Sequence, residues 1–181
     1  DLLMSADVGR LALFLGNEAI VRGAIEAGVA VVCGYPGTPA SEILDTLFRL
    51  APSLGIRCEY GVNEKVALEV AAGAAQAGVR SMVSFKHLGL NVAADPLPTL
   101  ANTGVQARMV VVTAGEPGNH TSPNEQDHRL FARMARLPML EPATPEQARA
   151  MTVLAFELSE DLQVPVLLRP TTRISHTRSI V

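Results

Sequence analysis

The chain has 181 residues, of which 48% are hydrophobic and 18% are charged, and its formal net charge is −3. This length supports one substantial hydrophobic core and fits a single domain better than two. The 15 lysines and arginines form no block, which argues against binding of nucleic acid or of an anionic membrane surface.

Short runs rich in Val, Ile and Leu alternate with helical patterns, and Gly or Pro marks many of the turns between them. In chain order we expect a helix at 17–27, a strand at 30–34, a helix at 41–51, a strand at 57–60, a helix at 63–77, a strand at 81–85, a helix at 88–102 interrupted at Asp95-Pro96, a strand at 109–113, a helix at 125–134, a strand at 139–141, a helix at 145–158 and a strand at 164–169.

Strands that alternate with helices and lack polar alternation of their own are typical of a parallel sheet with both faces covered. The pattern predicts an α/β fold, a three-layer α/β/α domain with a mostly parallel sheet of about six strands. We interpret residues 1–181 as one domain of a longer subunit. The polar tail at 171–181 is predicted to be an exit linker that leads to another domain.

The setting of the protein is also suggested by simple features of the chain. Its apolar runs are far shorter than the ~20 residues of a membrane-spanning helix, and we recognise no signal peptide. Cys33 and Cys58 lie in strand-like runs without a C-x-x-C pair, so we expect inert buried thiols rather than metal ligands. A reducing, cytoplasmic setting is the simplest expectation.

Ligands of open parallel sheets bind beyond the carboxyl ends of the strands. Four predicted loops follow strands and carry polar, glycine or proline residues, at 35–39, 61–64, 86–87 and 114–124. We therefore expect these loops to share one rim of the sheet and to hold the functional residues.

Glu64 opens an alanine-rich helix, GVNEKVALEVAAGAAQAG, directly after Asn63, a good N-cap residue. A carboxylate in the first turn gains roughly 0.3–1 kcal/mol from the helix dipole, which would be a purely structural role. On a helical wheel, however, Lys65, Glu69 and Gln76 define the solvated face, and Glu64 lies about 120° away among alanines. A carboxylate on that side is either paired or used, since burying it unpaired is costly.

Other rim residues have a functional and a structural interpretation each. In the Tyr35–Pro39 loop, backbone amides and the Thr38 hydroxyl suit an anion, or the loop is a tight turn in which Gly37 serves equally. Lys86-His87 can stabilise a carboxylate or an oxyanion, or be a surface lysine and a helix-capping histidine. Asn91, one helical turn later, lines the same wall or packs between helices.

The segment at 115–122, GEPGNHTS, is polar and glycine-rich, and loops of this kind often carry function. His120 is a candidate for acid–base chemistry or substrate contact, or else a solvated loop histidine. His128 and His176 are predicted to lie on a helix surface and in the tail, without a functional role.

Three long stretches of the chain resemble a known family. They are GNEAIVRGAIEAGVAVVCGYPGTPASEI, GVNEKVALEVAAGAAQAG with FKHLGLNVAADPL after it, and GEPGNHTSPNEQDHR. They look like the amino-terminal domain of the large subunit of indolepyruvate ferredoxin oxidoreductases, which are thiamin-diphosphate-dependent 2-oxoacid:ferredoxin oxidoreductases. The resemblance runs from Gly16 to LLRPTTRISHTRS, nearly the whole chain.

The resemblance implies a pyrimidine-binding (Pyr) fold that grips the aminopyrimidine end of thiamin diphosphate. Glu64 matches the family glutamate that hydrogen-bonds the N1′ atom of that ring and activates the cofactor. The implied reaction is oxidative decarboxylation of a 2-oxoacid, with arylpyruvates favoured. Electrons pass through iron–sulfur clusters to ferredoxin, and the acyl group passes to coenzyme A.

Candidate roles follow from the rim position and the resemblance together. The candidates are Glu64, His87 and His120 for catalysis, Asn63, Glu64, Gly37, Lys86 and Asn91 for cofactor binding, and Thr38 and Tyr35 for substrate binding. By the resemblance, Thr38 faces the substrate carboxylate.

The chain also lacks parts that such enzymes need. It has no G-D-G motif, no spaced Asp/Asn set for Mg²⁺ and no iron–sulfur ligands, so we predict no metal site here. Mg²⁺ and the clusters are expected in missing parts of the enzyme, and the isolated domain should be inactive. The expected partners are the diphosphate-binding domain of the same subunit or of another protomer, a second subunit, ferredoxin and coenzyme A, in a homodimer.

Two other classes of function are alternatives to a thiamin-diphosphate-dependent enzyme. A non-catalytic assembly or regulatory module could share this fold, although it would not need Glu64 on the small apolar side. A dinucleotide-dependent oxidoreductase is disfavoured because no G-x-G-x-x-G follows a strand.

Overall fold

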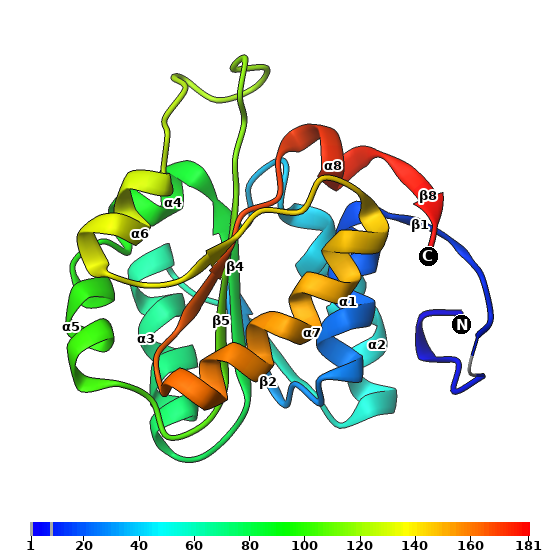
Figure 1. Ribbon diagram of the computed structural model, residues 1–181, viewed down its shortest axis with the longest axis horizontal. Coiled ribbons are helices and arrows are strands. Elements are labelled where there is room, and N and C mark those ends of the chain that lie inside the picture. The colour runs from blue at the N-terminus through cyan, green and yellow to red at the C-terminus, as the bar shows by residue number, and fades with distance from the viewer. Residues whose placement is uncertain (1, 8) are drawn as a thin grey trace.

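The computed structural model describes residues 2–7 and 9–181. A six-stranded sheet with the order β3-β2-β4-β5-β7-β6 forms its centre, and every neighbouring pair of strands is parallel (Figure 1). The strands are β2 Val31–Gly34, β3 Arg57–Tyr60, β4 Ser81–Lys86, β5 Met109–Ala114, β6 Met139–Leu140 and β7 Val166–Leu168. All six predicted strands and the predicted α/β fold are confirmed.

Helices cover both faces of this sheet (Figure 1). One face carries α1 Gly16–Glu26, α2 Ser41–Leu54 and α7 Pro145–Leu162, and the other carries α3 Glu64–Gln76, α4 His87–Val92, α5 Pro96–Thr103 and α6 Arg129–Ala135. Successive strand residues therefore serve different cores. Met82 packs with the first set of helices, and Val83 packs with the second.

Cap residues in the sequence mark the starts of α3 and α7 and the end of α2. The Asn63 side chain accepts a hydrogen bond from the Val66 amide at 2.9 Å, and so starts α3. The Thr144 hydroxyl does the same for the Gln147 amide at 3.1 Å, with Pro145 as the first residue of α7. α2 ends at Gly55, whose φ of 67° is the left-handed conformation that glycine adopts readily.

The start of one helix near the site differs from the sequence-based expectation. The helix predicted at 125–134 begins only at Arg129, so residues 125–128 belong to the preceding loop. Figure 1 shows this loop, 115–128, rising from the end of β5 above the body of the domain.

The tail at 171–181, predicted to be an exit linker, contains regular structure. It contains α8 Thr172–His176 and β8 Arg178–Ile180, and β8 pairs antiparallel with β1 Leu13–Leu15. Ile174 and Ser175 are buried against the domain. The chain also contains a short 3-10 helix, η1 Leu2–Met4.

The two cysteines lie on adjacent strands but in different cores, since Cys33 packs with α3 while Cys58 packs against the cluster under α1 and α2. Burial, with nearby Glu59, raises the pKa of the Cys33 thiol to about 11. Burial, with Cys33 and Glu59, raises that of Cys58 to about 12. Both are therefore protonated and unreactive at neutral pH, as predicted, although Cys58 is only partly buried.

Candidate functional site

The carboxyl ends of the parallel strands bring the four predicted loops to one rim. Gly34, which ends β2, is in register with Tyr60 on one side and with Ser84 on the other. At the end of β4, Lys86 is in register with Ala114 of β5. The loops at 35–39, 61–64, 86–87 and 114–124 therefore start side by side.

Glu64 is the first residue of α3 and lies at this rim half-buried. The predicted wheel is confirmed, because Ala67 and Ala71 are fully buried while Glu69 and Gln76 are exposed. Within residues 2–7 and 9–181, the Glu64 carboxyl has no hydrogen-bond or ion-pair partner. The Glu64 side chain therefore lies at the edge of an apolar wall, where a ligand can reach its carboxyl group.

Gly89, the third residue of α4, lies against this carboxylate. A Cβ atom at Gly89 would stand 2.6 Å from Glu64 Cγ and 2.9 Å from its Oε1 atom. Asn63, directly before Glu64, caps α3 and so holds the first turn in which Glu64 lies. The beginnings of α3 and α4 thus form a narrow seat for one side chain, a feature that the sequence analysis missed.

The Tyr35–Pro39 loop is held by side chains outside the predicted set. The Ser41 hydroxyl accepts a hydrogen bond from the Gly37 amide at 3.0 Å. The buried Asn17 amide donates to the Pro39 carbonyl and to the Glu42 carboxylate, each at 2.8 Å. Thr38 and Tyr35 remain exposed at the rim. Their position is compatible with substrate contact, which stays a prediction.

Lys86 is half-buried and contacts two of the rim loops. A Cβ atom at Gly37 would stand 3.1 Å from Lys86 Cδ and 3.2 Å from its Cγ, which places the lysine stem across this glycine. The Nζ atom donates to the Ser122 hydroxyl at 3.4 Å. Gly37 and Lys86 therefore form one wall of the rim together.

His87 is fully buried, and its Nε2 atom lies 3.2 Å from the Asn124 carbonyl oxygen. The alternative of a helix-capping histidine is wrong, because Nε2 contacts this loop carbonyl and Nδ1 has no hydrogen-bond partner within residues 2–7 and 9–181. In this arrangement the imidazole holds the 115–128 loop. Asn91 is exposed and donates to the Gln126 side chain at 2.8 Å, so it also contacts this loop rather than packing between helices.

Glu116 organises the 115–128 loop from within. Although only 2% exposed, its carboxylate accepts hydrogen bonds from the Thr121 amide at 2.5 Å, the Thr121 hydroxyl at 2.8 Å and the Ser122 amide at 3.0 Å. Burial alone would raise its pKa, but the hydrogen bonds from Ser122 and Thr121 outweigh it and lower the pKa to about 2. The loop is thus a built structure, with His120 exposed near its tip.

His128 is the clearest correction to the sequence analysis, which placed it on a helix surface. It is fully buried, and its Nδ1 atom lies 2.7 Å from the Thr113 hydroxyl. Burial, followed by the nearby Arg169 and His87, lowers its pKa to about 3. The prediction failed because α6 starts one residue after His128, which changes the side on which the imidazole lies.

A buried polar cluster therefore lies beneath the loop. The His87 and His128 rings lie 6.0 Å apart, and Arg169 at the end of β7 bonds Glu141 at 2.6 Å. No single sequence motif predicts this cluster of His87, His128 and Arg169, since its members come from distant segments.

His176, which was predicted to lie in the tail without a functional role, is exposed at the end of α8. Its Nε2 atom lies 3.4 Å from a Glu42 oxygen.

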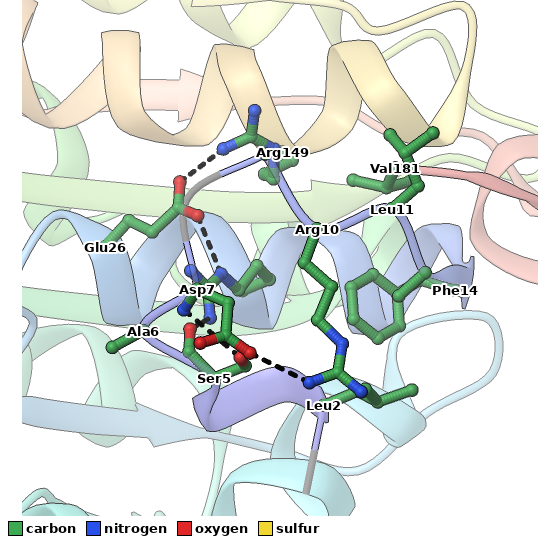
Figure 2. Close-up of a pocket in the computed structure, with 13 residues that line it drawn as sticks. Leu2, Ser5, Ala6, Asp7, Arg10, Leu11, Phe14, Glu26, Arg149 and Val181 are labelled. Carbon is green, nitrogen blue, oxygen red and sulfur yellow. Dashed lines mark hydrogen bonds and ion pairs between the residues drawn. The ribbon is translucent and has the colours of Figure 1, made fainter.

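A cavity of about 380 Å³ lies away from the rim, between the N-terminal segment and the helices α1 and α7 (Figure 2). Each of its charged side chains is already in an ion pair, as Arg10 pairs with Asp7 and both Arg22 and Arg149 pair with Glu26. We place the candidate site at the rim, where Glu64 has no such partner.

The described residues contain neither a metal-binding cluster nor a membrane-spanning helix. No group of three or more His, Cys, Asp or Glu side chains in residues 2–7 and 9–181 is arranged to hold a metal ion. In the same residues, no helix has the length and apolar character needed to span a membrane.

Comparison with known proteins places the chain in a family. The chain is 54% identical over 179 residues to the indolepyruvate oxidoreductase subunit IorA of Methanothermobacter thermautotrophicus, covering 99% of this chain and 29% of that protein. It is 48% identical to the corresponding subunit of Thermococcus kodakarensis, with 28% of that protein covered. It is 31% identical over 159 residues to the ketoisovalerate oxidoreductase subunit VorB of M. thermautotrophicus, covering 84% of this chain and 45% of that one.

A solved structure has the same fold. It is the 2-oxoglutarate:ferredoxin oxidoreductase from Magnetococcus marinus, with a TM-score of 0.86 at 22% identity, over 94% of this chain and 31% of that one. The chain thus spans less than a third of the length of these IorA subunits and of this enzyme chain. The family described as "Pyruvate flavodoxin/ferredoxin oxidoreductase, thiamine diP-bdg" matches residues 22–181. The chain belongs to this family of thiamin-diphosphate-binding domains.

Proposed function

We propose that this domain supplies the aminopyrimidine half of a thiamin diphosphate site in a 2-oxoacid:ferredoxin oxidoreductase, and that Glu64 activates the cofactor. The single observation that carries the proposal is the seat of Glu64, a half-buried carboxylate at the rim with no partner in the described part of the chain. A carboxylate that exchanges a proton with a bound ring must be both accessible and fixed in direction.

The residues at the rim fit this cofactor. The Glu64 side chain is seated against Gly89 beside the buried alanines of α3, and it is only half-buried, so a flat ring can approach its carboxyl from the rim. Lys86 and the exposed Thr38 stand on the neighbouring wall, where a cation and a hydroxyl suit an anionic 2-oxoacid. When bound, thiamin diphosphate supplies the carbon nucleophile and the electron sink for decarboxylation.

Each rim residue then has a task that its position supports. Glu64 shares a proton with a ring nitrogen through a hydrogen bond, and Asn63 orients Glu64 by capping α3. Lys86 holds the walls on either side together through Gly37 and Ser122. The buried His87 orders the 115–128 loop, while a direct catalytic role for His87 or for the exposed His120 stays a prediction.

The substrate class and partners are part of the same proposal. Relatives named indolepyruvate oxidoreductase are 46–54% identical to this chain, against 31% for the ketoisovalerate enzymes, which favours an arylpyruvate. Ferredoxin and coenzyme A would accept the electrons and the acyl group. The diphosphate, its Mg²⁺ and the iron–sulfur clusters would be held by parts of the enzyme outside this chain, so the isolated domain is expected to be inactive.

The test is Glu64→Gln in the complete enzyme, measured as arylpyruvate-dependent reduction of ferredoxin. Glutamine preserves the shape of the side chain but cannot exchange the proton, so we expect turnover to fall by about 10²-fold or more. Glu69→Gln, an exposed position on the same helix, is the control and should leave turnover unchanged. Normal turnover in Glu64→Gln would favour the alternative, a non-catalytic assembly or regulatory module.

A further inference from the structure

Gly89 has no backbone reason to be glycine. It lies within α4 and is absent from the described glycines with positive φ, so its conformation is one that any L-residue adopts. Glycine in a helix interior is less stable than alanine, because it loses more backbone entropy on folding. The reason for glycine at this position must therefore lie in what surrounds it.

The surroundings leave no room for a side chain. The nearest atoms to a Cβ built at Gly89 are Glu64 Cγ at 2.6 Å, Glu64 Oε1 at 2.9 Å and Phe85 Cβ at 3.0 Å. Real Cβ atoms essentially never approach other heavy atoms closer than 3.0 Å. Phe85 is part of the buried strand β4, so it cannot give way cheaply.

Glu64 is the group that would have to move. Its Cγ atom is close to its own backbone, which the Asn63 cap fixes at the first turn of α3. The carboxyl can avoid a Cβ at Gly89 only by rotating away from α4, toward solvent or toward the ligand side of the rim. Such a rotation changes the direction in which the carboxyl presents its oxygen atoms.

We propose that Gly89 is a positioning residue for Glu64: its missing side chain leaves room for the rotamer in which the carboxylate meets the aminopyrimidine ring. The inference rests on the proposed function, and deepens it by naming the residue that aims the activating group. Misplacement of a reacting group by about 1 Å costs on the order of 10²-fold in rate.

The experiment compares Gly89→Ala with Gly73→Ala in the complete enzyme. Gly73 is a matched control, because it is also helical, lies in α3 and has nothing within 4 Å of its built Cβ. The first readout is the rate of hydrogen–deuterium exchange at C2 of bound thiamin diphosphate, which needs no 2-oxoacid. We expect Gly89→Ala to slow this exchange by about 10²-fold, and Gly73→Ala to leave it unchanged.

A second readout separates positioning from a general structural defect. With Gly89→Ala at saturating cofactor, kcat should fall in step with the exchange rate while the KM for the 2-oxoacid stays near the wild-type value. In a Glu64→Gln background, Gly89→Ala should cause no further loss, because the group that it aims is already disabled. A full additional loss in that background would contradict the inference.

The outcomes distinguish this inference from the proposed function. Slow exchange in Glu64→Gln together with normal exchange in Gly89→Ala leaves the function standing and overturns the role of Gly89. Normal exchange in Glu64→Gln overturns both. If Gly89→Ala does not assemble, Glu64→Ala/Gly89→Ala, in which the opposing Cγ is removed, should assemble; failure of both variants would mean that Glu64 is not what the glycine accommodates.

Discussion

Glu116→Gln should release the 115–128 loop without unfolding the domain. The replacement keeps one oxygen acceptor but turns the other into an NH₂ group, which then faces a donor at Thr121 or Ser122. The fall of the Glu116 pKa from 4.5 to about 2 corresponds to about 3 kcal/mol at ~1.4 kcal/mol per pKa unit. Solvent at the outer face of the loop screens the charge, so we expect a loss of about 2 kcal/mol.

Amide hydrogen exchange of residues 115–125 in the complete enzyme measures this loss directly. About 2 kcal/mol corresponds to a fall of roughly 30-fold in the protection of the Thr121 and Ser122 amides, normalised to intrinsic rates. The control is Glu125→Gln, which disturbs one exposed hydrogen bond, from the Gly118 amide at 3.1 Å, and should change protection only slightly.

The same assay has a defined pH dependence in the wild-type enzyme. Because the folded pKa of Glu116 is lowered, its stabilisation is complete above about pH 4.5 and is lost as the pH falls toward about 2. Protection of Thr121 and Ser122 should fall in that window and should be independent of pH there in Glu116→Gln. Equal protection of the two amides in both proteins at neutral pH would refute the assigned role of Glu116.

Two further perturbations test the structure around the rim. The folded pKa of His128 is lowered to about 3, so unfolding becomes easier as the pH falls from about 6.5 to about 3. His128→Asn keeps a hydrogen-bonding group toward Thr113 and should remove this dependence in acid-unfolding curves. An unchanged curve would contradict the burial of His128. Asn17→Ala removes the bonds to Pro39 and Glu42 and should destabilise the fold by about 1–3 kcal/mol in urea unfolding, with increased exchange of the Gly37 and Ala40 amides. Normal protection of those two amides would show that the loop does not depend on Asn17.

The sheet and the position of Glu64 could be predicted because both depend on local patterns. Continuous apolar runs define β4 and β5, and a helical wheel alone places Glu64 beside Ala67 rather than beside Glu69. The rim then follows from the rule for parallel strands.

What could not be predicted depends on contacts between distant segments. β1 and β8 are three residues each and are nearly a whole chain apart, so neither carries a periodic signal. Glu116 reads as one more polar loop residue until the loop folds back around it. His128 was misplaced because a shift of the start of α6 moves the imidazole from solvent to the core, and helix boundaries are poorly fixed by sequence.

Lys86 has a consequence for how the rim moves. Its stem lies over Gly37 and its ammonium group reaches Ser122, so one side chain spans two loops that belong to different strands. If either loop shifts, the lysine must re-orient, and the other loop then loses its cover or its hydrogen-bond donor. The two loops should therefore move together. An anion that competes for the Lys86 ammonium group would loosen both of them.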